Sequence, residues 1–451
     1  MTVLSDNAVK DRMSDFSSWG TAPDLSFKPD VSAPGGQIYS TVNDNKYETM
    51  SGTSMAAPHA SGSAALVLQS LKKNNPNLSG RELVERAKIL LSNSAEQLMD
   101  TNNLPYSPRK QGAGLIKTDK AINAKAYVVN EDGRPNVALR DFTENKEFKI
   151  KIKNMSNEDM TFKLSNPFGV LSNSLLYGLY INIKEAKIDG ANVEFDKNEV
   201  TVGANEEAEV SVVLNIDENV PQNIFLEGFI KIEELENKTP SMTVPFIGFY
   251  GKWDEVRVLD APIWDEQTYY GVTCLTDEFG YYLGYAGFDY NLLLPKILPD
   301  MISISPNADG LFDNVQPNLT FLRNAKEFKV ELIDETRNVL RELSYDINIR
   351  KNLGTQYTPA YMNPNWLWDG MLYDMFGTPQ VASEGQYYLR FKSKVDYTGA
   401  KWQEVEMPVK VDLTVPEVKV NATKREGNVF NFDFTGSKDN VGIYGYIVFR
   451  D

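Results

Sequence analysis

The sequence predicts a multidomain chain in which an α/β segment is followed by all-β sandwiches. Its 451 residues are enough for about three domains of ordinary size. Helical apolar patterns end near residue 125, and alternating strand patterns separated by turn clusters follow. We therefore predict an α/β portion at 1–125, a β-sandwich at 126–252, a second at 253–415 and the start of a truncated third at 416–451.

The first segment is predicted to contain two main helices. One begins near residues 53–54, ends near Lys72 and carries apolar or small residues on nearly every face. Such a pattern is typical of a helix buried in the middle of a domain. The second helix is indicated by Ser79 as N-cap and Glu82 three residues later, which together form a capping box. A last helical piece is expected near 118–125.

The sandwiches are predicted from short runs whose apolar residues alternate or whose composition favours strands. These runs occupy residues 148–153, 209–212, 328–332, 387–395 and 405–413. Side chains of a strand point alternately to its two faces, so each run can bury one face and expose the other. Domain joints are expected near 251–254 and 413–416.

Composition excludes several functional classes. A formal net charge of −16 argues against nucleic-acid binding, because a polyanion needs a basic surface. The single cysteine, Cys274, permits no internal disulfide and is predicted to be a small buried apolar residue. No stretch approaches the roughly 20 apolar residues of a membrane span, and the start does not resemble a signal peptide. We expect both Met1 and Asp451 to be interior points of a longer chain.

The run Ser51-Gly52-Thr53-Ser54-Met55-Ala56-Ala57-Pro58-His59 carries the chemistry. Ser54 is predicted at a helix N-terminus, where unpaired N–H groups and the positive end of the dipole favour an oxyanion. Gly52 is expected to permit unusual φ/ψ angles and a close backbone approach. A serine nucleophile needs a histidine base oriented by a carboxylate, yet the sole histidine, His59, follows on the same helix. A plain serine cap on a buried helix is the alternative interpretation.

Three stretches, 13–20, 28–36 and 50–65, resemble the subtilases in order and spacing. Within that superfamily they are similar to the Gram-positive cell-envelope proteinases, the lactocepins and the streptococcal complement-cleaving peptidases. The resemblance implies a subtilisin-like parallel α/β catalytic fold that cleaves protein or peptide substrates with an Asp-His-Ser triad and an oxyanion Asn. It assigns the nucleophile to Ser54. It also implies that His59 is a packing residue that faces the interior.

In that family the catalytic Asp, His and oxyanion Asn all precede the nucleophile segment. None of the 53 residues before Ser54 matches their motifs, and Asp30 belongs to a Lys-Pro-Asp element with another place in the family pattern. We therefore expect a serine endopeptidase fragment that is inactive alone and whose partner is the N-terminal part of the catalytic domain. A non-catalytic cell-surface binding or adhesion segment is the alternative. The resemblance implies secretion or cell-wall attachment.

The stretches 305–313, 368–370 and 385–388 resemble recurring elements of fibronectin type III-like modules. The two sandwiches and the truncated third are therefore predicted to be such modules. Asn307, Asp309 and Asp313 offer oxygen ligands for Ca²⁺, although an Asx-turn is the preferred interpretation of this loop. We expect no other cofactor.

Aromatic residues cluster at 264–270 and 281–290. Such a cluster can form a patch that grips a substrate or a host protein. Packing within the sandwich or between domains is the preferred interpretation.

Overall fold

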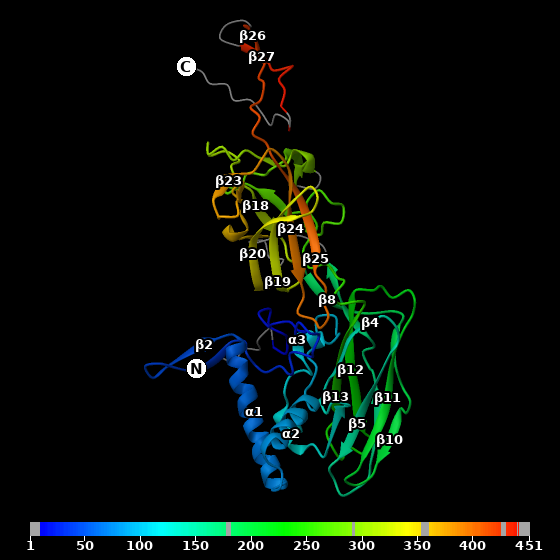
Figure 1. Cartoon of the computed structure of the whole chain (residues 1–451). Coiled ribbons are helices and arrows are strands. Elements are labelled where there is room, and N and C mark those ends of the chain that lie inside the picture. Colours follow the sequence, from blue (N-terminus) through cyan, green and yellow to red (C-terminus); the bar gives the residue numbers. More distant parts are fainter. Residues whose placement is uncertain are drawn as a thin grey trace. The chain divides into compact units, whose positions relative to one another are not determined.

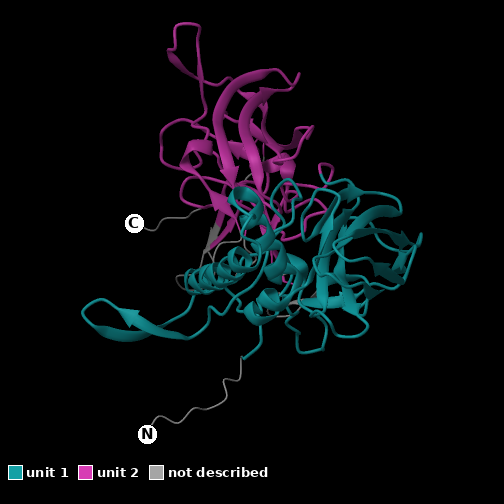
Figure 2. Ribbon diagram, turned by 90° about the horizontal axis from the view of Figure 1, so that it is seen from below, with its two compact units in different colours: residues 1–253 teal, residues 254–451 magenta. Residues whose placement is uncertain are grey.

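The computed structural model of the chain describes residues 10–176, 182–290, 294–352, 360–424, 430–439 and 441. It divides into two compact units, Met1–Trp253 and Asp254–Asp451 (Figure 2). Because this division is made at one point, the domain boundaries expected near residues 125 and 415 stay predictions. Among the described residues, no helix combines the length and apolarity that crossing a membrane requires.

Unit 1 begins with a helical segment, which we define as residues 10–125 (Figure 1). Its elements are β1 Ile38–Val42, β2 Lys46–Met50, α1 Thr53–Asn74, α2 Gly80–Asn93, α3 Pro108–Gln111 and α4 Thr118–Asn123. Helices α1, α2 and α4 pack on one another, and Val67, Leu71 and Leu90 are among the buried residues of their shared core. The predicted helices are thus confirmed. The β1–β2 hairpin extends away from the helices.

Helix α1 is far less buried than its sequence pattern predicts. Of its 22 residues, Val67 and Leu71 are buried, whereas Leu66 is 52% exposed. The expectation that α1 is buried on nearly every face is therefore wrong for the described part of the chain. Its partners α2 and α4 pack against it, and apolar residues on its other faces meet solvent.

The predicted capping box of α2 does not form. Ser79 is the N-cap, but its side chain accepts no hydrogen bond from the first turn. Gly80, the first residue of the helix, has a left-handed φ of 58°. This φ departs from the geometry in which an N-cap hydroxyl accepts the N–H groups of the two or three residues that follow it. Glu82 instead lies 3.7 Å from Arg86 one turn later, as an ion pair on the helix surface.

Residues 126–253, which we call the first sandwich, form two sheets around one core. One sheet has the order β10-β6-β12-β13-β4, with the hairpin β7–β8 attached to β12; the other has the order β3-β5-β11-β9. The strands are β3 Ala126–Asn130, β4 Val137–Phe142, β5 Lys146–Asn154, β6 Met160–Ser165, β7 Leu171–Leu176, β8 Asn182–Lys187, β9 Ala191–Phe195, β10 Glu199–Val202, β11 Glu207–Ile216, β12 Ile224–Glu234 and β13 Met242–Tyr250.

The core of the first sandwich follows from strict alternation. In β5, Phe148, Ile150 and Ile152 are buried while the lysines between them are not. Ile150 pairs with Val210 of β11 across the antiparallel register, so both strands turn the same face to the core. The strands predicted at 148–153 and 209–212 are confirmed.

Strand β13 is buried along its whole length, unlike an alternating strand. It pairs with β12 and β4 and also contacts α2 and α3. Asn93 at the end of α2 joins this helix to β13 and β3. Its side chain donates to the carbonyl of Thr243 and accepts from the N–H of Val128. The helical segment therefore packs directly on the first sandwich.

Unit 2 is built on a sheet of order β17-β25-β24-β19-β20 and a smaller sheet of order β14-β18-β21. Its elements are β14 Cys274–Thr276, β15 Tyr285–Asp289, β16 Leu294–Ile297, η1 Pro299–Met301, β17 Ser303–Ile304, β18 Gln316–Leu319, β19 Ala325–Asp334, β20 Val339–Ile349, β21 Tyr361–Met362, η2 Pro364–Trp366, β22 Met371–Tyr373, β23 Pro379–Val381, β24 Gly385–Lys394 and β25 Gln403–Val411. Trp366, Trp368, Phe328 and Phe391 fill its core. The strands predicted at 328–332, 387–395 and 405–413 are confirmed, with bounds that differ by at most three residues.

The chain after unit 2's main sheets contains one described hairpin, β26 Asn421–Lys424 and β27 Phe430–Asp433. Most of the residues from 440 onward lie outside the described part of the chain. The third sandwich expected to start at residue 416 therefore stays a prediction.

Candidate active site

Ser54 is the second residue of α1, and its side chain lies at the exposed start of the helix. The Gly52 carbonyl accepts the N–H groups of Met55 at 3.0 Å and Ala56 at 3.3 Å. The N–H groups of Thr53 and Ser54 precede that of Met55, the first to bond within the helix, so they point out of the helix end. Together with the positive end of the helix dipole, they can stabilise negative charge that forms beside the Ser54 hydroxyl.

A close backbone contact supports this turn, and Gly35 rather than Gly52 makes it possible. The N–H of Gly52 donates to the carbonyl of Gly35 at 2.8 Å. A Cβ at Gly35 would lie 2.8 Å from the Gly52 oxygen and 3.1 Å from the Cβ of Ala56. Gly52 itself is extended, with φ 160° and ψ 164°, and a Cβ there would meet only ordinary contacts. The prediction that Gly52 adopts unusual φ/ψ angles is therefore wrong.

His59 is placed away from Ser54 by the helix. Five residues along α1 correspond to about 7.5 Å of rise and about 140° of rotation, so the two side chains leave on different sides. His59 is exposed, and its Nδ1 lies 2.8 Å from the Met55 carbonyl. The expectation that His59 faces a packed interior is wrong among the described residues. The separation of His59 from Ser54 does not suit a base that removes the serine proton, and the sequence contains no second histidine.

The described residues offer Ser54 no catalytic partner. Asp30 forms an ion pair with Lys28 at 2.6 Å, and no group of three His, Cys, Asp or Glu residues is arranged to hold a metal ion in the described ranges. A hollow of about 430 Å³ is lined by Val67, Leu71 and Met155, and it contains no residue of the 51–59 run. Among the described residues, Ser54 therefore lies at an exposed helix N-terminus with the one histidine of the sequence on another side of the helix.

Comparison with known proteins finds a family match for two parts of the chain. The subtilase family profile matches residues 1–114, and the profile of an Fn3-like domain matches residues 137–247. The first quarter of the chain therefore matches the subtilase family. The recognition of a subtilase segment joined to a fibronectin type III-like domain is confirmed.

Two classes of curated relatives extend over nearly the whole chain. The PI-type proteinase of Lactococcus lactis subsp. cremoris is 33% identical over 468 residues, which cover 96% of this chain and 24% of the relative. The PII-type proteinase of Lacticaseibacillus paracasei is also 33% identical, with the same coverage. The C5a peptidase of Streptococcus pyogenes serotype M1 is 27% identical over 91% of this chain and 40% of its own length. The chain thus spans about a quarter to two fifths of the length of these relatives.

A cluster that the sequence interpretation missed lies where the helical segment meets the first sandwich. Arg109 of α3 donates to Glu227 of β12 through Nε at 2.9 Å and Nη2 at 3.3 Å, and its guanidinium lies over the Phe225 ring at 3.9 Å. It also donates to Asn173 of β7, whose amide donates to Glu185 of β8 at 2.7 Å. Glu227 is fully buried. A lone Glu inside the apolar run 224–230 is the sequence signal that could have indicated this contact.

The negative charge of Glu185 is not neutralised by a cation of its own, because the two buried carboxyl groups of Glu185 and Glu227 share Arg109. Burial raises the pKa of Glu185 to about 7. A backbone hydrogen bond from Ser107 and the charge of Arg109 lower this pKa, whereas the negative charges of Glu227 and Asp100 raise it. Glu185 therefore exchanges a proton near neutral pH.

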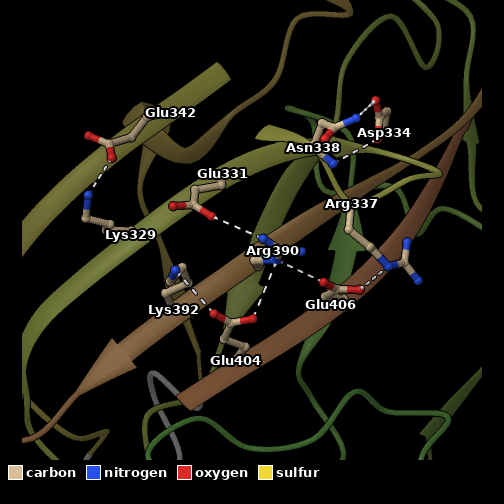
Figure 3. Close-up of polar contacts among 10 residues, drawn as sticks. All are labelled: Lys329, Glu331, Asp334, Arg337, Asn338, Glu342, Arg390, Lys392, Glu404 and Glu406. Atoms are coloured by element: carbon tan, nitrogen blue, oxygen red, sulfur yellow. Dashed lines mark hydrogen bonds and ion pairs between the residues drawn. The ribbon is translucent and has the colours of Figure 1, made fainter. Parts of the chain in front are cut away.

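A second polar cluster covers one face of the main sheet in unit 2 (Figure 3). Arg390 of β24 lies 2.9 Å from Glu406, 3.7 Å from Glu404 and 3.8 Å from Glu331. Lys392 lies 3.2 Å from Glu404. Each cation faces a carboxylate of a neighbouring strand, as in cross-strand ion pairs that stabilise a sheet.

The predicted Ca²⁺ ligands lie together in the loop before β18, where backbone groups engage their oxygens. The Asp313 carboxylate accepts the N–H groups of Asn307, Ala308 and Gly310 at 2.7 to 3.0 Å. The Asn307 side-chain oxygen accepts the N–H of Asp309 at 2.9 Å. The bond between Asn307 and Asp309 is an Asx-turn, as the preferred interpretation expects. Ca²⁺ binding here stays a prediction.

The aromatic clusters divide between core and surface. Trp264 and Tyr285 pack against the core of unit 2, whereas Tyr281 and Tyr290 are 61% and 82% exposed. Cys274 is buried, as predicted, and burial raises the pKa of its thiol to about 12. It is therefore a packing residue rather than a nucleophile.

Proposed function

We propose that this chain supplies the nucleophile, Ser54, of a secreted or cell-wall-attached subtilisin-like endopeptidase that acts on proteins or peptides. The observation that carries the proposal is the place of Ser54 at the N-terminus of α1, within the stretch that matches the subtilase family. The names of the proteinase relatives support protein substrates, and their membership of the cell-envelope group supports the location.

In the proposed reaction Ser54 Oγ attacks the peptide carbonyl, and its own N–H donates to the resulting oxyanion. The proton of the hydroxyl must pass to a base, and His59, the one histidine of the sequence, lies on another side of α1. We infer that the Asp, His and oxyanion Asn come from polypeptide outside these residues. The exposed faces of α1 and the β1–β2 hairpin are surfaces that such a partner would cover.

Labelling with a fluorophosphonate tests this proposal directly. We expect the purified 451-residue chain to show no more labelling than its Ser54→Ala variant, since no base removes the hydroxyl proton. Co-expression with a subtilase segment that carries Asp-Thr-Gly and His-Gly-Thr motifs should produce labelling that requires Ser54. Labelling of the isolated chain that depends on Ser54 would contradict the claim that it is inactive alone.

A non-catalytic role in surface binding or adhesion is the second candidate, and exposed Tyr281 and Tyr290 favour it. The DNA upstream of the Met1 codon discriminates between the two. An in-frame extension that encodes the two motifs supports the endopeptidase, whereas a promoter and ribosome-binding site directly before Met1 support the binding role.

A further inference from the structure

A continuous set of backbone hydrogen bonds leads from Arg109 toward the nucleophile turn. The carbonyl of Arg109 accepts the N–H of Gly20 at 2.7 Å. Just beyond α3, the N–H of Ala113 donates to the carbonyl of Asp30 at 3.0 Å. The N–H of Ser32 then donates to Gly114 at 2.8 Å. The stretch 109–116 thus acts as a template against which residues 20–32 are held.

The same set of contacts continues to Ser54. Ser32 is three residues before Gly35, whose carbonyl holds the N–H of Gly52 at 2.8 Å. The hydroxyl of Ser51 accepts the N–H of Gln37 at 2.8 Å, which adds a second contact between the two stretches. A displacement of the template therefore reaches the start of α1 through a few bonded residues.

We propose that Arg109 is a positioning residue through which the first sandwich holds the backbone beside Ser54. Its guanidinium is fixed on both sides by the first sandwich, by the two-point contact with Glu227 and by the Phe225 ring. Its main chain belongs to the template that supports the nucleophile turn. The first sandwich is therefore part of the framework of the active site and not a spacer that follows it.

The proton on Glu185 gives this arrangement a pH dependence that a simple packing contact lacks. When Glu185 is protonated, Arg109 and Glu227 form a balanced buried pair. When Glu185 ionises, a second negative charge is buried beside Glu227 and near Asp100, with Arg109 as the one cation among the groups that act on it. The stabilisation by protonated Glu185 is complete below about pH 4.5 and is lost as the pH rises through about 7.

Amide hydrogen exchange on the full 451-residue chain tests the proposal without any need for catalysis. In the Arg109→Gln variant we expect exchange at Ser32 and Gly52 to accelerate on the order of tenfold, with the β5 amides unchanged. Arg109→Lys keeps the charge but loses the two-point contact, so it should restore protection in part. Arg140→Gln is the matched control, because this arginine also joins the first sandwich to the helical segment, at Asp24, but is 46% exposed. Equal acceleration throughout α2, or none at Ser32 and Gly52, would overturn the proposal.

The pH profile supplies the second readout, with rates corrected for intrinsic exchange. In the unmodified chain, protection at Gly52 should fall as the pH rises from 5 to 8. Glu185→Gln mimics the protonated side chain and should keep the protection constant, and it also serves if Arg109→Gln fails to fold. Identical profiles for the two proteins would overturn the role of Glu185.

This inference rests on the proposed function only in that it takes Ser54 as the nucleophile. Failure of the fluorophosphonate experiment would leave these exchange results unaffected.

Discussion

The helical segment and the first sandwich satisfy their apolar residues to very different degrees. In the first sandwich, Phe162, Ile150 and Val210 are completely buried within one core. In the helical segment, Phe16 is 50% exposed and Leu66 of α1 is 52% exposed. The first sandwich is therefore complete in itself on its inner faces, while the helical segment presents apolar surface that suits further packing.

This difference teaches where the stability of unit 1 resides. Burial of apolar area is the dominant favourable contribution to folding, and the first sandwich holds most of the fully buried large side chains in unit 1. The helical segment depends on contacts at β13 and Arg109 for part of its order. Substitutions of the same type in the two regions should therefore have unequal effects.

The largest expected effect comes from a matched pair of phenylalanines. Phe162→Ala in β6 should lower the free energy of unfolding by about 3–5 kcal/mol, because it leaves a cavity in a closed core. Phe16→Ala should change it by no more than about 0.5 kcal/mol, because the ring already meets solvent. Urea unfolding of the two variants measures both values. A large loss for Phe16→Ala would show that the helical segment is packed as well as the first sandwich.

A smaller effect is expected at the turn that precedes Ser54. Gly35→Ala places a Cβ against the backbone of Gly52, and we expect a loss of about 1–3 kcal/mol together with loss of protection at the Gly52 amide. Gly36→Ala is the control, since the nearest neighbour of its Cβ is the movable Ser14 hydroxyl at 3.4 Å. Thermal unfolding and amide exchange report both variants. If the two behave alike, the turn is looser than the Gly35 contact implies.

The smallest effect concerns an ion pair inside the helical segment, which contrasts with the buried pair of Arg109. A hydrogen bond from Lys120 and the contact with Lys117 lower the pKa of the Glu96 carboxyl. Because this pKa is lowered, its stabilisation is present above about pH 4.5 and is lost as the pH falls below that value. These side chains are about a third to a half exposed, so Glu96→Gln should cost at most about 0.5 kcal/mol at pH 7 and nothing at pH 2. Unfolding at the two pH values measures the difference; an equal loss at both would exclude an ionic cause.

Much of the fold could be predicted where one residue pattern decides the structure. The alternation in 148–153 and 209–212 places β5 and β11 correctly, because a half-buried strand leaves a period of two in the sequence. The position of Ser54 at a helix start could also be predicted, because helix caps and the helical apolar pattern depend on residues close together in the sequence.

The rest depends on contacts between residues far apart in the sequence. The pattern of α1 indicates a helix that can be buried, but it does not indicate whether this chain holds the covering surface, so the burial of α1 and His59 was predicted wrongly. Arg109 and Glu227 are 118 positions apart, and nothing local joins them. Gly35 acquires its importance from Gly52, with which it makes contact only after folding.

Strand β13 has a consequence for how this architecture can be divided. All nine of its residues are buried, because one side faces the sandwich core while helices α2 and α3 also pack on the strand. Residues 126–253 expressed without the preceding 125 would expose part of an apolar strand and should be prone to aggregate. Gene rearrangements that exchange modules between proteins would therefore have to carry the helical segment and the first sandwich as one heritable block.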